Sequence, residues 1–150
     1  MRWGVLAMLL VGCSSTLDTR YPHRIDFALG EKQEMGDAAI EITELRGSRP
    51  DIAVGGEYLV RGRYRLHGAD EGVLTFFLTA DNWNNTGPIM DLQRQTVTRG
   101  EGTFELQHRM EGPGAFHVTI YDAQWNELFD QYIGARATVT PSSRTASVRR

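Results

Sequence analysis

The chain has 150 residues with a single cysteine and a formal net charge of −3 at pH 7, which suits one domain whose core is stabilised by packing without disulfides. The negative net charge argues against a nucleic-acid partner, because binding to phosphates requires a basic surface. Lys32 is the only lysine, so the chain lacks a suitable lysine for a phosphate-binding loop or for a Schiff base.

The first element is a short apolar segment at the N-terminus. Arg2 gives a positive start, Trp3–Val11 is an apolar run and small Gly12 precedes Cys13, a layout typical of a secretory signal. The run is too short to cross a membrane, because about 20 apolar residues are needed to span a ~30 Å hydrocarbon core. We therefore expect residues 1–12 to be a signal peptide that is removed during export.

The four residues Leu10-Val11-Gly12-Cys13 resemble the lipobox of bacterial lipoproteins. The resemblance implies that Cys13 carries acyl chains such as palmitate and becomes the first residue of the mature chain. Each buried methylene of such chains contributes about 0.8 kcal/mol of membrane anchoring. Ser14, in place of an acidic residue, implies passage to the outer membrane. We therefore expect a lipid-anchored protein of the cell envelope that faces the periplasm or the cell exterior.

Polar segments flank the expected domain. Residues 13–36 are polar apart from the patch Ile25–Leu29, and we expect a lipidated tether with this patch as a candidate edge strand. Residues 141–150 have no apolar face to bury, which predicts a disordered basic tail. The folded domain is thus expected over residues 37–140.

Apolar and polar residues alternate with period two along the expected domain, which is the pattern of half-buried β-strands. Clusters of Gly, Pro, Asp and Asn bound each run and predict turns. About seven such strands, without a convincing helical stretch, predict an all-β fold, an antiparallel immunoglobulin-like β-sandwich. The apolar positions of the clearest runs are Ile40, Ile42, Tyr58, Val60, Tyr64, Leu66, Phe104, Leu106, Phe116, Val118 and Ile120.

The central stretch also resembles a group of small uncharacterised bacterial envelope domains. The resemblance implies a β domain and implies no catalytic residues. The matching motifs lie at Gly36–Gly47, Gly62–Leu66, Arg99–Leu106 and Pro113–Tyr121.

The hydrophobic pattern decides how the two histidines beside the turn R-M-E-G-P-G-A are placed. A hairpin that pairs Leu106 with Val118 buries the apolar side chains of both strands, and burial of each contributes roughly 1.5 to 3 kcal/mol. In this register His108 points inward near Phe116, while His117 points outward beside Gln107. We therefore expect no metal site made by these two imidazoles.

A second hairpin, across H-G-A-D-E-G, is expected to pair Leu66 with Leu74 and to place Phe77 opposite Arg63 on the outer face. Guanidinium groups beside an exposed aromatic ring can bind an anionic or carbohydrate partner. The alternative is a solvated face whose arginine stems cover a neighbouring ring. The candidate binding face consists of Arg61, Arg63, Arg65 and Phe77.

Two loops carry tryptophan among polar residues, Trp83 in 81–87 and Trp125 in 122–127. An exposed Trp can stack on a sugar ring or anchor an interface. The acidic and amide residues of the first loop favour an Asx-rich turn over a Ca²⁺ site, because their spacing departs from the calcium-loop pattern.

Catalytic residues, metal ligands and cofactors are not indicated by the sequence. None of the serines lies in an expected strand-to-helix elbow or core loop, and the four histidines show no ligand spacing. The favoured function is therefore a non-enzymatic binding or interaction module, held to the membrane through Cys13, with an envelope protein or glycan as partner. The alternatives are an envelope hydrolase with a loop-borne carboxylate site and a purely structural envelope component.

Overall fold

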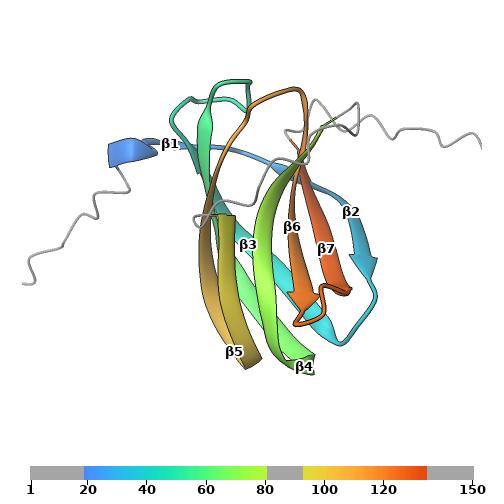
Figure 1. The fold of residues 1–150 in the computed structure, drawn as a ribbon. Helices are drawn as coiled ribbons and strands as arrows, with labels where there is room; N and C mark the ends of the chain where they lie inside the picture. The colour runs from blue at the N-terminus through green and yellow to red at the C-terminus, as the bar shows by residue number, and fades with distance from the viewer. Residues whose placement is uncertain (1–18, 81–92, 135–150) are drawn as a thin grey trace, which may run out of the picture.

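The computed structural model describes residues 19–80 and 93–134, and the elements of its sheet are seven β-strands (Figure 1). Every strand pairing is antiparallel, which confirms the expected all-β, antiparallel class. Within these two ranges no helix has the length and apolarity to span a membrane. The strands are β1 (His23–Arg24), β2 (Ala28–Glu34), β3 (Ala38–Gly47), β4 (Glu57–Ala80), β5 (Arg94–Arg109), β6 (Gly114–Asp122) and β7 (Glu127–Gly134).

The strand β4 is 24 residues long and runs through the segment where a hairpin turn was expected. Its first half pairs with β3, its second half pairs with β6, and β5 pairs with both halves. The backbone N–H groups of His67 and Gly68 both donate to the carbonyl of Asp37, at 2.8 and 2.9 Å. These bonds keep the H-G-A-D-E-G segment beside the start of β3. β4 turns back at this bend (Figure 1), but its two halves pair with β3 and β6 and not with each other. The expected pairing of Leu66 with Leu74 is therefore wrong.

All seven strands belong to one sheet in the order β1-β3-β4-β6-β7-β2, with β5 on β4 outside this path. The sheet curls into a half-barrel (Figure 1). β5 bends at Gly100, whose φ of 115° lies in the left-handed region that favours glycine. The side chain of Gln95 stabilises the bend, because it donates to the carbonyl of Thr103 at 3.1 Å and accepts from the N–H of Glu105 at 3.4 Å.

The expected hairpin between β5 and β6 is also wrong. β5 pairs with β4, so Leu106 lies opposite Val60, and β6 pairs with β4 and β7. The long strand β4 offers backbone partners to both β5 and β6, and these two consecutive strands therefore do not need to pair with each other. The faces were nevertheless predicted correctly: Phe104, Leu106, Val118 and Ile120 are all buried.

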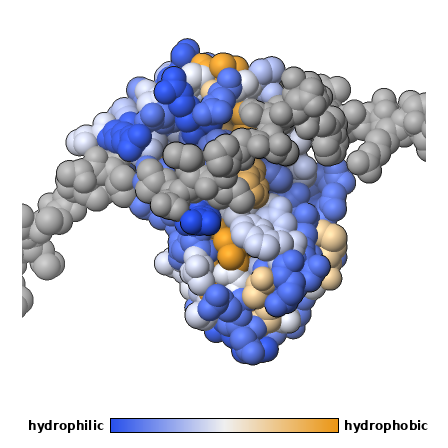
Figure 2. Space-filling view, in the orientation of Figure 1, coloured by the Kyte–Doolittle hydropathy of each residue, from blue (hydrophilic) through white to orange (hydrophobic). Residues whose placement is uncertain are grey.

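The hydrophobic core lies on the inner face of the curled sheet. Its centre is aromatic, with the rings of Tyr58 and Phe76 at 5.2 and 4.8 Å from that of Phe116. The hydroxyl of Tyr58 donates to the carbonyl of Asp51 and accepts from the N–H of Ala53, so the core also fixes the β3–β4 loop. The side of the molecule seen in Figure 2 is mostly hydrophilic, with apolar residues in small patches.

The domain includes residues that were expected to form the tether. Tyr21 and Ile25 are buried, with 1% and 5% of their surface exposed. β1 pairs with β3, and β2 pairs with β7. The structure therefore assigns residues 19–36 to the folded domain, and the expected tether over 13–36 is too long, because these strands complete both edges of the sheet.

Aromatic rings cover glycines on neighbouring strands of the inner face. A Cβ atom on Gly62 would lie 2.5 Å from the ring of Phe104, and one on Gly102 would lie 2.6 Å from the ring of Tyr64. Gly62 lies opposite Phe104, and Gly102 lies opposite Tyr64. The absence of a side chain at each glycine therefore lets the ring on the partner strand lie against the backbone.

We predict that Gly62→Ala lowers the free energy of unfolding by about 1 to 3 kcal/mol, because the new methyl group would overpack the core. It would also lie 2.3 Å from the backbone carbonyl of Glu41, which cannot move without disturbing β3. Gly112→Ala is the matched control, since its Cβ would meet nothing within 4 Å. Urea denaturation measures both variants, and equal midpoints for the two would contradict the close packing at Gly62.

Candidate functional site

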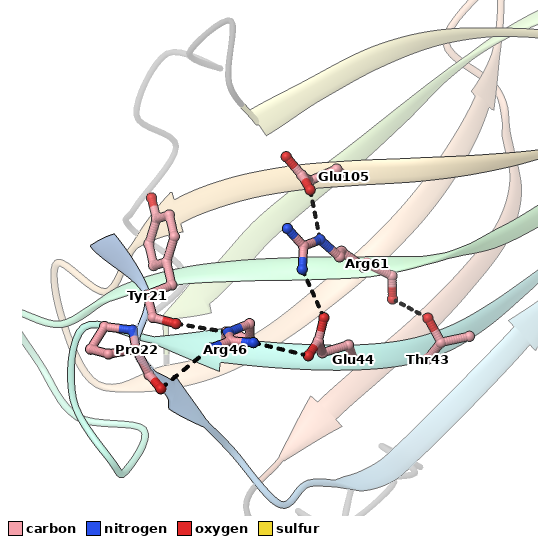
Figure 3. Close-up of polar contacts among 7 residues, drawn as sticks. All are labelled: Tyr21, Pro22, Thr43, Glu44, Arg46, Arg61 and Glu105. Carbon is pink, nitrogen blue, oxygen red and sulfur yellow. Dashed lines mark hydrogen bonds and ion pairs between the residues drawn. The ribbon is translucent and has the colours of Figure 1, made fainter. Parts of the chain in front are cut away.

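The candidate arginine face lies on the outer face of the sheet, opposite to the core, and its first member is fully engaged. Arg61 donates from Nη1 to Glu44 at 2.9 Å and from Nε to Glu105 at 2.6 Å (Figure 3). The hydrogen bond to Glu105 and then that to Glu44 raise the pKa of Arg61 above its ordinary value. We call Glu44, Arg61 and Glu105 the charge ladder, since they cross β3, β4 and β5 side by side.

The remaining arginines are exposed but are surrounded by opposite charges. Arg63 lies opposite Glu41 on β3, and Arg65 lies opposite Glu101 on β5. All four line one depression of ≈ 310 Å³. Because acidic and basic groups alternate here, the surface favours the alternative of a solvated, charge-balanced face over an anion site.

Phe77 does not belong to this surface. It lies in the second half of β4, opposite His117 on β6, because β4 continues where the hairpin was expected. The four residues Arg61, Arg63, Arg65 and Phe77 are thus not brought together as one binding face.

A different surface is formed where β4, β6 and β7 pair. Phe77, His117 and Tyr132 are cross-strand neighbours in one row on the outer face. The imidazole of His117 stacks on the ring of Tyr132 at 5.0 Å and lies 5.5 Å from the ring of Phe77. We name this surface the aromatic face, and its members are Phe77, His117, Tyr121, Trp125 and Tyr132.

A buried carboxylate lies beneath the aromatic face. Asp130 is 4% exposed, and its Oδ1 lies 3.1 Å from Nδ1 of His117 and accepts from the hydroxyl of Thr119 at 3.0 Å. The other imidazole nitrogen, Nε2, lies 3.3 Å from the hydroxyl of Thr79. With the Nδ1 proton directed at Asp130, Nε2 is the acceptor for Thr79. The four side chains therefore form one hydrogen-bonded chain across three strands.

Titratable groups around this chain are shifted toward their protonated forms. Burial raises the pKa of Glu127, and the negative charge of Asp130 raises it further. Burial also raises the pKa values of Tyr121 and Tyr132. The hydroxyl of Thr119 lowers the pKa of Tyr121, and that of Thr79 lowers the pKa of Tyr132, so both partly offset the effect of burial. Perturbed groups gathered around a buried His-carboxylate pair are a typical feature of functional sites.

Trp125 extends the aromatic face into the β6–β7 turn. Its ring lies 5.5 Å from that of Tyr121, and 52% of the residue is exposed. Its φ of 63° lies in the left-handed region, a conformation that costs a bulky residue about 1 to 3 kcal/mol. The carboxylate of Asp122 holds the turn by accepting from the N–H groups of Gln124 and Asn126. The hydrogen bonds from Asn126 in turn lower the pKa of Asp122.

The chemistry of this site is hydrogen bonding, ring stacking and proton acceptance. In residues 19–80 and 93–134 no group of three or more His, Cys, Asp and Glu side chains is placed to hold a metal ion. The order Thr79, His117, Asp130 matches the arrangement of hydroxyl, base and orienting carboxylate in nucleophilic catalysis. Stacking on rings and bonding to buried polar groups also suit a polar ligand.

His108 and His117 both face the sides that the sequence predicts, but His117 has other neighbours than expected. His108 faces the core, 5.8 Å from the ring of Phe116, as predicted, and burial lowers its pKa. His117 faces outward as predicted, but it packs between Phe77 and Tyr132, with its side chain only 15% exposed. Its expected neighbour Gln107 instead accepts a hydrogen bond from Tyr21.

The role of Asp130 was missed by sequence reasoning. It lies in E-L-F-D-Q-Y-I-G, a run whose aromatic and apolar positions indicate a strand, and an aspartate inside such a run is a signal for a buried, paired carboxylate. Cys13, Trp83, the signal peptide 1–12 and the tail 141–150 lie outside the described residues.

Comparisons of the chain with protein-family models, curated proteins and solved structures find no match.

We predict that Arg61→Ala lowers the free energy of unfolding by roughly 1 kcal/mol, because Glu44 and Glu105 would then face each other without the cation. The loss should shrink in about 0.5 M NaCl, which screens the remaining repulsion. Arg63→Ala is the matched control on the same strand and should be nearly neutral. Denaturant unfolding at low and high salt measures both, and a larger loss for Arg63→Ala would contradict the charge ladder.

We predict that Glu127→Gln stabilises the protein at pH 7. The raised pKa of Glu127 means that the folded state binds its proton more tightly than the unfolded state, so ionisation of Glu127 reduces stability as pH rises. The gain should disappear below about pH 4, where the carboxyl is protonated in both states. Unfolding midpoints across this pH range measure the effect, with exposed Glu71→Gln as control; a gain that persists at low pH would contradict the shift.

Proposed function

We propose that the protein is a lipid-anchored binding module of the cell envelope and that it binds its partner through the aromatic face. The anchor is inferred from the resemblance of Leu10-Val11-Gly12-Cys13 to a lipobox. The binding role rests chiefly on one observation. Phe77, His117 and Tyr132 form a continuous row of rings on the outer face, and the central ring, that of His117, lies 3.1 Å from the buried carboxylate of Asp130. The partner is an envelope protein or glycan.

The strain at Trp125 supports a role in contact. A bulky residue in the left-handed region is unfavourable, and half of this side chain is exposed. A glycine or asparagine would satisfy the turn at lower conformational cost. A rigid, half-exposed indole is well suited to stack on a sugar ring or to anchor a protein interface.

A second candidate function is hydrolysis. The hydrogen-bonded chain Thr79–His117–Asp130 favours it, with Thr79 as nucleophile, His117 as base and Asp130 as the orienting carboxylate. This arrangement lies on strands and differs from the loop-borne carboxylate pair expected from the sequence. The side chain of His117 is only 15% exposed, which limits the access of a substrate to this base, and for this reason we favour the binding role.

The immunoglobulin-like class of the fold stays a prediction. The described strands form one continuous curled sheet, which is compatible with a distorted sandwich in which β4 and β5 cross between two layers.

Site-directed photo-crosslinking in cells tests the binding role against protein partners. We predict that p-benzoylphenylalanine at position 125, in the chain with its native N-terminus, gives an adduct of defined size. The same residue at position 63, on the charge-balanced surface, is the matched control and should give none. Equal adducts from both positions would contradict a specific aromatic face.

Co-sedimentation with purified insoluble cell-wall glycan tests whether the partner is a glycan. Trp125→Ala should reduce the bound fraction strongly, because a central tryptophan commonly contributes about 2 kcal/mol or more to binding, while Arg63→Ala should leave it unchanged. If Trp125→Ala leaves the bound fraction unchanged, the aromatic face is not the glycan-binding surface. If adducts and sedimentation are both absent, the binding role itself fails.

A further inference from the structure

The N-terminal segment of the domain joins the sheet only a few residues after the expected lipid anchor. Seven peptide units separate Cys13 from Arg20, and a fully extended chain reaches at most about 3.3 to 3.6 Å per residue. If Cys13 carries the lipid, Arg20 therefore lies within about 25 Å of the acylated residue. This argument rests on the lipid anchor of the proposed function.

The segment is fixed to the domain from Arg20 onward. Arg20 donates twice to Glu57, at 3.0 and 2.9 Å. The side chain of Tyr21 is buried, and its hydroxyl donates to Gln107 on β5 at 2.8 Å. These contacts attach the entering chain to β4 and β5, so the short connection ends on a rigid surface.

Arg46 on β3 completes this attachment. Its guanidinium donates to the carbonyl of Tyr21 at 2.8 Å and to that of Pro22 at 3.3 Å (Figure 3). It also pairs with Glu44 at 3.5 Å, and Glu44 belongs to the charge ladder. Arg46 therefore couples the backbone of the entering chain to three strands of the sheet.

The attachment lies at one end of the curled sheet. β1 pairs with the last residues of β3, next to the β3–β4 connection over residues 48–56, and we call this the junction end. The far end carries the bends of β4 and β5 and the β6–β7 turn (Figure 1). The ten residues of β3 run between the ends and span about 30 Å.

We infer that the junction end faces the lipid bilayer and that the far end is held away from it. The exposed side chains Arg49 and Val54 then lie next to the lipid headgroups. Trp125 and Met35, each more than half exposed, are presented at the far end. Met35 belongs to that end because its backbone N–H donates to the carbonyl of Leu128 at the start of β7. Trp125 belongs to it because it lies in the β6–β7 turn.

Paramagnetic relaxation in lipid nanodiscs tests this orientation. The chain from Cys13 onward is coupled through its single thiol to a maleimide phospholipid, in discs of phosphatidylethanolamine and phosphatidylglycerol that contain a gadolinium-chelating lipid. Amide signals of residues 48–56 should relax several-fold faster than those of residues 122–127. Equal enhancement at the two ends, or stronger enhancement at 122–127, would overturn the orientation.

Two variants separate the orientation from mere proximity. A Gly/Ser insertion of about 20 residues after Ser15, with a root-mean-square span of roughly 25 Å, should abolish the difference between the ends. Arg46→Met should weaken it while the folded spectrum is retained, and Arg63→Met should not. A difference that survives the insertion would show that the anchor connection does not set the orientation.

A separate measurement tests the proposed lipid anchor itself. Mass spectrometry of the chain expressed with its native N-terminus reports whether residues 1–12 are lost and acyl mass is gained. An unmodified chain refutes the lipid anchor and with it the biological basis of the orientation. An acylated chain with equal enhancement at both ends in the nanodiscs refutes the orientation alone.

Discussion

The backbone hydrogen bonds of β4 are the interaction on which the rest of the structure depends. This one strand pairs with β3, β5 and β6, so both halves of the sheet share it. Its bend follows from the capture of two N–H groups by the carbonyl of Asp37. This bend directs the second half of β4 to β6, and that pairing places Phe77 beside His117.

The two halves of the outer face consequently differ in chemistry. Around the first half of β4, acidic and basic side chains cancel along the charge ladder, and Arg46 secures the entering chain. Around the second half, rings cover a carboxylate that is only 4% exposed. A buried charge persists only when it is paired and hydrogen-bonded, and His117 and Thr119 supply these partners. Attachment and recognition are thus assigned to different parts of one sheet.

Sequence reasoning located the strands and their buried faces because alternation is a local property. It failed on pairing, because H-G-A-D-E-G resembles a turn. The contacts that keep this segment in the sheet come from distant residues, the carbonyl of Asp37 and the side chain of Arg99. The candidate site was lost for the same reason: the contact between Phe77 and His117 depends on pairing between β4 and β6. Trp125 could be singled out from the composition of its loop, whereas its positive φ could not be predicted from the sequence.

Phe77, His117 and Tyr132 form one row on the outer face, and proton NOEs between their rings test this arrangement most directly. We expect strong NOEs from the His117 imidazole to the rings of Phe77 and Tyr132, whose centroids lie 5.5 and 5.0 Å away. NOEs from the Phe77 ring to Arg63, without any to His117, would contradict it, because they require the hairpin in place of a continuous β4.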